Sequence, residues 1–252
     1  NTLYATGVVS DHKNVVSGTL GITGGTSFGD KYYGGNVYVG GECTLSKEMN
    51  IGGDLSIGAR VTLANTMTVG GNMSIANNYV RITGKTYVRG NFNHNYSAQL
   101  LMERGRLEVE GNYVSKSSDY YTGIYMYYAE DYIYVHGNME YHPYYSTSMS
   151  TGTIEVGGDF NASRNLTASG SHRFVFSGDK RQQINIATSC YFATVELKNY
   201  SEEGVYATTL FTKSKLITNG CRISYAGYEG EIGWTLQGDQ TYEGDLVLLE
   251  DT

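Results

Sequence analysis

The chain has 252 residues and a formal net charge of −7, from 18 Lys and Arg against 25 Asp and Glu. This acidic balance disfavours nucleic acid or an anionic membrane as a partner, and no apolar run is long enough for a membrane-spanning helix. Only 17% of the residues are charged, whereas 33 are Gly and one is Pro. Many tight turns within a regular β architecture are therefore expected, because Pro would remove hydrogen-bond donors from a sheet.

The chain begins at Asn1 rather than Met and shows no signal peptide, so we expect a processed or excised fragment. Cys43, Cys190 and Cys221 match no zinc or redox spacing. Cys43 occupies an apolar repeat position, which favours a small buried hydrophobe. Cys190 and Cys221 would form a disulfide only if adjacent coils brought them together.

Residues 1–36 are interpreted as an N-terminal cap or first coils. From Val37 to Ile75 the sequence divides without slippage into the hexads VYVGGE, CTLSKE, MNIGGD, LSIGAR, VTLANT, MTVGGN and MSIANN. The first and third positions are apolar in every hexad, which predicts a short strand with one buried face, followed by a turn. Three hexads make an 18-residue coil. Stacking lets each coil bury its apolar face, so the repeat predicts a parallel β-helix.

Beyond the hexads, the motif apolar-x-Val/Ile-x-Gly-Asp/Asn-apolar recurs at longer spacing. Its second glycines fall at 53, 71, 90, 111, 137, 158 and 178. We expect each glycine to adopt a left-handed conformation at a corner and each Asx side chain to bond nearby backbone. The outward residues between the apolar positions predict one column on one face: Tyr38, Asn50, Thr68, Tyr87, Glu108, Tyr134 and Glu155.

After residue 178 the copies degrade, although 195–197, 210–212, 216–217 and 234–239 still have the pattern of strands. The whole chain, 1–252, is therefore predicted to be one all-β domain, a single-stranded parallel β-helix with about 18–26 residues per coil. Residues 37–178 form its regular coils with Tyr-rich loops, and 179–252 form irregular coils or a cap.

Three blocks, residues 131–139, 152–160 and 172–184, resemble β-helical repeats in large secreted or surface proteins of Gram-positive anaerobes. That resemblance implies an extracellular or cell-surface location. The strict hexads are similar to those of bactofilin-type polymerising β-helices. The tāpirins, cellulose-binding surface adhesins, are similar in their β-helix and Tyr content rather than in a matched motif. They imply a plant cell-wall polysaccharide as the partner.

Tyrosine is the outlying residue type, because 11 of the 24 lie between residues 113 and 145. Alternation in 124–127 and 132–135 predicts aliphatic side chains inward and tyrosines outward. Tyr120, Tyr121 and Tyr128 are expected on an enlarged loop, and Tyr141, Tyr144 and Tyr145 on a second loop around Pro143. Aromatic rings stack on sugar faces, so the predicted carbohydrate-binding residues are Tyr120, Tyr121, Tyr125, Tyr127, Tyr128, Tyr132, Tyr134, Tyr144 and Tyr145. Tyrosine ladders that only stabilise the sheet are the alternative.

No catalytic residue, metal site or cofactor is predicted. A solvated sheet edge is the expected role of Glu108, Glu110 and Glu155. His136 is expected to be a solvated corner residue. The five histidines are scattered and have no metal-ligand spacing. The leading function is a non-catalytic extracellular adhesin-type module that binds insoluble, cellulose-like polysaccharide through outward tyrosines. A structural spacer or self-assembling stalk that associates through the solenoid ends is the second hypothesis. A polysaccharide lyase or hydrolase is the third.

Overall fold

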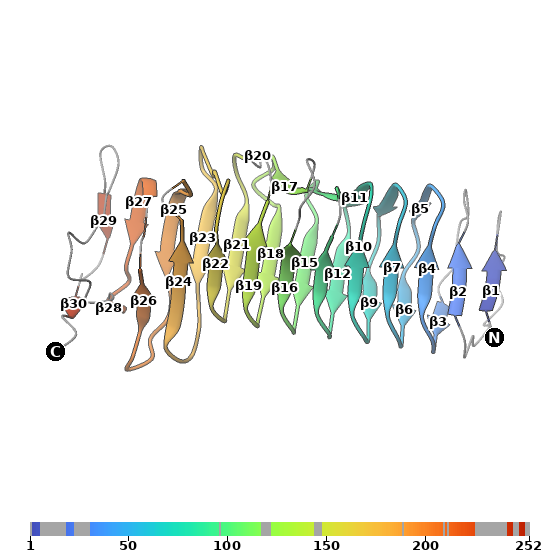
Figure 1. The fold of residues 1–252 in the computed structure, drawn as a ribbon, viewed down its shortest axis with the longest axis horizontal. Coiled ribbons are helices and arrows are strands. Elements are labelled where there is room, and N and C mark those ends of the chain that lie inside the picture. The colour runs from blue at the N-terminus through green and yellow to red at the C-terminus, as the bar shows by residue number, and fades with distance from the viewer. Residues whose placement is uncertain are drawn as a thin grey trace.

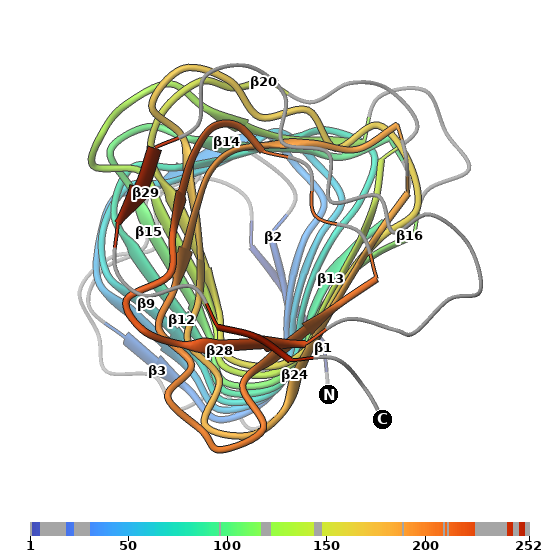
Figure 2. The same cartoon turned by 90° about the vertical axis from the view of Figure 1, so that its left-hand side faces the viewer.

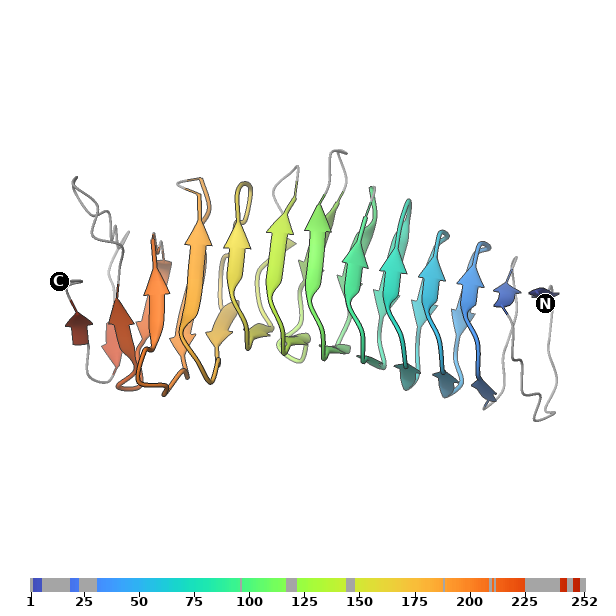
Figure 3. The ribbon, with the colours of Figure 1, turned by 60° about the horizontal axis from the view of Figure 1, so that its bottom comes forward.

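The computed structural model describes residues 2–5, 19–22, 31–95, 97–116, 122–143, 148–187, 189–208, 210, 212–224, 241–243 and 247–249. These residues form strands and turns, and they include no helix that could cross a membrane. All the paired strands run parallel and stack along one long axis (Figures 1 and 3). The fold is therefore the predicted all-β parallel solenoid.

Three sheets form the sides of the coil, which is seen end-on in Figure 2. Sheet 1 has 13 strands: β1 (Thr2–Ala5), β2 (Thr19–Ile22), β4 (Val37–Val39), β7 (Leu55–Ile57), β10 (Met73–Ile75), β13 (Phe92–His94), β16 (Tyr113–Lys116), β19 (Met139–His142), β22 (Phe160–Ala162), β24 (Gln182–Ile186), β26 (Val205–Ala207), β28 (Arg222–Ser224) and β30 (Val247–Leu249). Sheet 2 has 11 strands: β3 (Lys31–Tyr33), β6 (Met49–Ile51), β9 (Met67–Val69), β12 (Lys85–Val88), β15 (Arg106–Val109), β18 (Tyr132–Val135), β21 (Thr153–Val156), β23 (Arg173–Phe176), β25 (Phe192–Leu197), β27 (Thr212–Ile217) and β29 (Thr241–Glu243). Sheet 3 has 6 strands: β5 (Cys43–Leu45), β8 (Val61–Leu63), β11 (Tyr79–Ile82), β14 (Gln99–Met102), β17 (Gly123–Met126) and β20 (Ser148–Met149).

The hexads form one strand each, as predicted. Strands β4 to β10 are three residues long, and the first and third residues of each are buried. Val37 pairs with Leu55 and Leu55 with Met73, so one coil takes three hexads. From β4 to β21 the chain visits sheet 1, then sheet 3, then sheet 2. The apolar pattern thus encodes both the strands and their register, because a one-residue slip would turn the buried face outward.

The corners between sheets 2 and 1 are stacked Gly-Asx pairs. The Gly71 amide donates to the Gly53 carbonyl oxygen at 2.9 Å, and the Asn72 amide donates to the Asp54 carboxylate at 2.7 Å. The same bond recurs in every coil of the series: the backbone amide of each residue donates to the side-chain oxygen of the one before it. The series is Asn36, Asp54, Asn72, Asn91, Asn112, Asn138 and Asp159. The Asx side chains therefore bond backbone as predicted, and they join consecutive coils.

The expected left-handed conformation of the corner glycines is wrong. The described glycines with positive φ are Gly152, Gly170, Gly204 and Gly220, which lie outside the motif. Close stacking is what requires glycine at the corners. A Cβ atom on Gly111 would lie 2.6 Å from the carbonyl oxygen of Gly90, a distance that real Cβ contacts do not reach.

Later coils enclose larger side chains. Phe174 packs against Phe160 and Phe192 with ring centroids 5.4 and 4.7 Å away. Tyr113 and Tyr141 are also fully buried. Tyr141 was expected on a loop, but it lies in β19 and its hydroxyl oxygen accepts from the Ile124 amide at 2.9 Å. The longer coils therefore use part of the tyrosine enrichment to fill their core.

Both ends of the chain contribute strands to the solenoid. β1 pairs with β2, and β2 pairs with β4, so residues before Val37 extend sheet 1. The predicted strands 195–197 and 216–217 lie in β25 and β27, whereas Leu210 is buried just before β27. The predicted strand 234–239 lies outside the described residues. All three cysteines are buried free thiols, so Cys190 and Cys221 form no disulfide.

Candidate functional site

The described tyrosines of the predicted site belong to one coil, residues 123–136, which we call the tyrosine coil. Tyr125 lies in β17 of sheet 3, and Tyr127 directly follows this strand. Tyr132 and Tyr134 lie in β18 of sheet 2, and Tyr128 lies in the turn between the two strands. All five side chains are exposed or half-buried. The predicted site residues Tyr120, Tyr121, Tyr144 and Tyr145 lie outside the described residues.

A buried carboxylate organises the corner between Tyr127 and Tyr132. Asp131 Oδ2 accepts from the Tyr127 and Tyr128 amides at 2.9 and 3.0 Å, while Oδ1 accepts from the Arg104 amide of the preceding coil at 2.6 Å. Burial raises the pKa of Asp131, and these hydrogen bonds oppose that rise. The Arg104 guanidinium lies 4.2 Å from the centre of the Tyr128 ring. Asp131 thus holds the backbone that carries two of the tyrosines.

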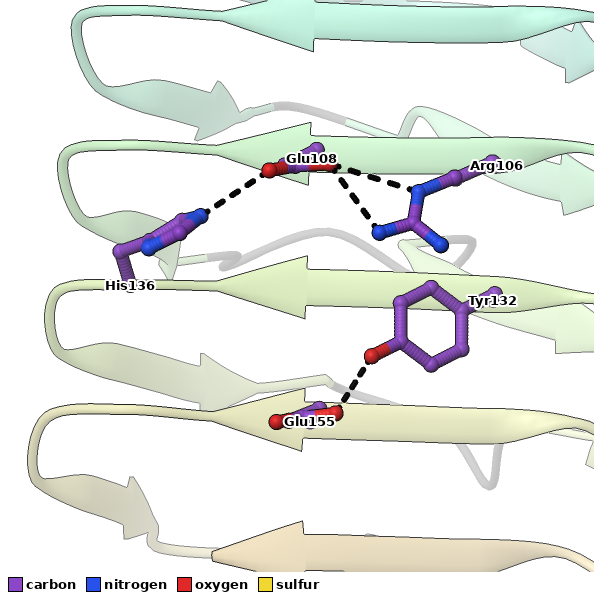
Figure 4. Close-up of polar contacts among 5 residues, drawn as sticks. All are labelled: Arg106, Glu108, Tyr132, His136 and Glu155. Carbon is purple, nitrogen blue, oxygen red and sulfur yellow. Dashed lines mark hydrogen bonds and ion pairs between the residues drawn. The ribbon is translucent and has the colours of Figure 1, made fainter. Parts of the chain in front are cut away.

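On sheet 2, Glu108 is the centre of an ionic network (Figure 4). Its Oε2 lies 3.1 Å from Arg106 Nη2, and its Oε1 lies 3.1 Å from His136 Nε2. Hydrogen bonds from His136 and Arg106, together with their charges, lower the pKa of Glu108 and outweigh the opposing effect of its partial burial. His136 is exposed, as predicted for a solvated corner residue, and Glu108 is half-buried. Each is also paired with the other across adjacent coils, which the prediction did not include.

The same network positions the two tyrosines of sheet 2. The Tyr132 hydroxyl donates to the Glu155 carboxylate of the next coil, and the Arg106 guanidinium lies 4.5 Å from the Tyr132 ring centre (Figure 4). Burial and the Glu155 contact raise the pKa of Tyr132. The Tyr134 and His136 rings lie 4.0 Å apart between centroids. One face of each tyrosine ring is therefore occupied by a basic or imidazole side chain.

The predicted outward column is correct for six of its seven members. Asn50, Thr68, Tyr87, Glu108, Tyr134 and Glu155 pair in that order across sheet 2. Tyr38 instead lies in β4 of sheet 1, opposite Ser56. The motif alone could not distinguish Tyr38 from the residues of sheet 2, because Gly-Gly also follows β4, a hexad strand that belongs to sheet 1.

Glu108 and Glu155 lie two coils apart with Tyr134 between them, a separation of about 9.6 Å along the sheet. A general acid in sugar hydrolysis needs a raised pKa, whereas Glu108 has a lowered one. Glu155 is engaged by Tyr132. In the described part of the chain, no group of three or more His, Cys, Asp or Glu side chains could hold a metal ion. The arrangement suits hydrogen bonding and stacking better than proton transfer.

Sheet 3 presents a second surface, which carries the predicted Tyr125 and Tyr127 and a hollow that the sequence did not predict. The Tyr125 and Tyr127 rings lie 6.5 Å apart between centroids, and Tyr127 is 50% exposed. Burial and the neighbouring Tyr127 and Tyr79 raise the pKa of Tyr125. Beside this pair is a hollow of about 560 Å³, lined by Glu42, Cys43, Thr44, Arg60, Val61, Thr62, Tyr79, Arg81 and Leu101. The hexad register could have predicted this shared face, because every third hexad strand joins the same sheet.

Fold and surface together define the chain as a parallel β-solenoid whose outer faces carry ordered tyrosine, arginine and glutamate side chains. No protein-family model, no curated protein and no solved structure matches the chain.

Proposed function

We propose that the chain is a non-catalytic extracellular adhesin-type module that binds insoluble, cellulose-like polysaccharide through the outward tyrosines of the tyrosine coil. One observation carries the proposal: all five described tyrosines of this coil reach the outer surface, where hydrogen bonds and a charged neighbour hold Tyr132 and the backbone of Tyr127 in place. An extracellular location belongs to the same proposal and rests on the resemblance of the Gly-Asx repeats to those of secreted solenoids.

Rigid aromatic side chains suit this ligand for an energetic reason. Binding loses free energy whenever a mobile side chain must be ordered, roughly 0.5–1.5 kcal/mol for each. The Asp131 bonds to the backbone at Tyr127, and the Tyr132 bond to Glu155, provide that order before a ligand arrives. Tyrosine also offers an apolar ring face and a hydroxyl group, which match the C–H faces and hydroxyls of a pyranose.

The tyrosine coil turns a corner, so a flat polysaccharide surface can meet only one of its faces fully. Tyr125 and Tyr127 lie on the sheet 3 side, where no cationic group contacts either ring among the described residues. On sheet 2 the Tyr132 ring already carries Arg106. The sheet 3 pair is therefore the better platform for stacking, and the sheet 2 pair contributes hydrogen bonds.

The test is retention on insoluble cellulose, xylan and chitin. Tyr125→Ala with Tyr127→Ala should weaken binding by about tenfold or more, because removing an interfacial aromatic anchor costs more than about 1 kcal/mol. Tyr132→Ala with Tyr134→Ala should have a smaller effect. A matched control removes Tyr38 and Tyr200, which are 46% and 70% exposed and lie outside this coil.

Two results would overturn the proposal. Wild-type protein that is retained on none of the three polysaccharides would leave the structural spacer as the better explanation. Release of soluble sugars by the wild type, lost in Glu108→Gln, would replace the adhesin with a polysaccharide-degrading enzyme.

A further inference from the structure

We propose that the hollow on sheet 3 is a track for one neutral glycan chain, which lies parallel to the solenoid axis and ends on Tyr125 and Tyr127. This inference rests on the proposed function and names the binding mode and the ligand class. It adds Tyr79, Arg81 and Leu101 to the binding residues.

The outward positions of sheet 3 form one continuous row. Thr44 pairs with Thr62, Thr62 with Arg81, Arg81 with Leu101, and Leu101 with Tyr125. Neighbouring strands lie about 4.8 Å apart, so the row spans about 19 Å. A short oligosaccharide fills such a length, whereas a single sugar would not.

The shape of the sheet favours the axial direction. The strands of sheet 3 are 2 to 4 residues long, so a chain that crossed the axis would leave the face at a corner after about 13 Å. Along the axis the face continues from strand to strand without interruption. The hollow of about 560 Å³ lies along this direction, since it extends from Glu42 to Leu101, and its volume is typical of a ligand site.

The charges of the track favour a neutral ligand. Arg60 Nη1 lies 3.8 Å from Glu42 Oε1, and Arg81 Nε lies 2.8 Å from Glu103 Oε1. Each arginine in the lining is therefore matched by a carboxylate beside it. An acidic polysaccharide would have to displace these carboxylates, whereas the hydroxyls of a neutral glycan can bond to both members of such a pair.

Apolar surface alternates with these polar groups. Arg60 stacks on Tyr79 at 4.9 Å from the ring centre, and Tyr79 remains 39% exposed. Leu101 separates Arg81 from Tyr125 in the row. A ligand with apolar C–H faces and hydroxyl edges matches this alternation, whereas a wholly polar ligand would leave Leu101 and Tyr79 uncovered.

Titration calorimetry with soluble cello- and xylo-oligosaccharides of increasing length tests the track. Affinity should rise with length until the row is filled. Tyr79→Ala should lower the affinity for the longer oligosaccharides about tenfold and affect the shortest less, because Tyr79 lies two strands, about 9.6 Å, from the strand of Tyr125. Tyr200→Ala is the matched control, and unfolding midpoints confirm that each variant is folded.

The outcomes separate this inference from the proposed function. Retention on polysaccharide that depends on Tyr125 and Tyr127 but is unchanged by Tyr79→Ala and Arg81→Gln would overturn the track alone. Tighter binding of anionic oligogalacturonides than of neutral oligosaccharides would overturn the ligand class. No retention of the wild type on any polysaccharide would overturn the proposed function and the track together.

Discussion

Tyr113 donates a hydrogen bond from its hydroxyl group to Nδ1 of His94 over 2.7 Å, and both side chains are fully buried in the solenoid. The other ring nitrogen, Nε2, lies 2.8 Å from the carbonyl oxygen of Ala98. A carbonyl oxygen can only accept, so Nε2 carries the proton and Nδ1 accepts. Two consecutive coils are thus joined by a polar pair inside an apolar core.

Tyr113→Phe should therefore lower the free energy of unfolding by about 1–3 kcal/mol, the cost of an unsatisfied buried acceptor. The aromatic ring that stacks on Phe92 at 5.1 Å is retained, so the change isolates the hydroxyl group. Urea unfolding measures the effect. Tyr38→Phe, at an exposed position, should change stability by less than about 0.5 kcal/mol. Equal midpoints for the two variants would contradict the prediction.

Acid should destabilise the protein through its buried histidines. Burial lowers the pKa of His94 to about 4 and that of His172 to about 3. In the unfolded chain each returns to about 6.5, so below this pH the unfolded state binds more protons than the folded state. Their contribution to stability is thus complete above about pH 6.5 and falls as the pH drops toward about 4.

Unfolding midpoints measured between about pH 8 and pH 4 check this expectation. His172→Phe should remove about one proton from the pH dependence, because the buried ring is neutral in the folded state and takes up a proton on unfolding below about pH 6.5. Neither ring nitrogen of His172 has a hydrogen-bond partner among the described residues. The substitution should also leave stability near neutral pH unchanged or increased, since no hydrogen bond is lost. A variant with the same pH dependence as the wild type would count against it.

Stacking at the corners predicts a contrast between two glycines. Gly111→Ala places a Cβ atom 2.6 Å from the Gly90 carbonyl oxygen and should cost about 1–3 kcal/mol, because backbone must move. Gly58→Ala meets only the flexible Tyr38 side chain, at 3.3 Å, and should cost less than about 0.5 kcal/mol. Thermal or urea unfolding compares the two variants. A similar loss in both would show that stacking does not explain the corner glycines.

Asp131→Asn tests the link between the corner and binding. An amide cannot accept from all three backbone amides, so we expect a loss of about 1–3 kcal/mol in stability. Retention on polysaccharide should also fall, since the backbone at Tyr127 and Tyr128 loses its anchor. Glu130→Gln, which is exposed at the same corner, should leave both measurements unchanged. Reduced stability with full retention would separate the corner from the proposed site.

The sequence alone determined the architecture. Hexad apolar positions from Val37 to Ile75 specified strand, turn and register together, because a strand with one buried face repeats every second residue. The Gly-Asx spacing located the longer coils correctly, although the role of the glycines came from close stacking between coils. Local pattern was sufficient wherever one coil repeats the next.

Only the tertiary structure decided which tyrosines share a surface. Tyr141 and Tyr125 both belong to the Tyr-rich stretch, yet Tyr141 fills the core from β19 whereas Tyr125 reaches the outer face of sheet 3. Tyr79 lies far from Tyr125 in the chain, but the two are near neighbours on that face. Alternation within a strand shows which side chains point inward and which point outward. Which of the three sheets a strand joins depends instead on the length of each coil. Neighbours in space on a solenoid are therefore a full coil or more apart in the chain, beyond the reach of any local pattern.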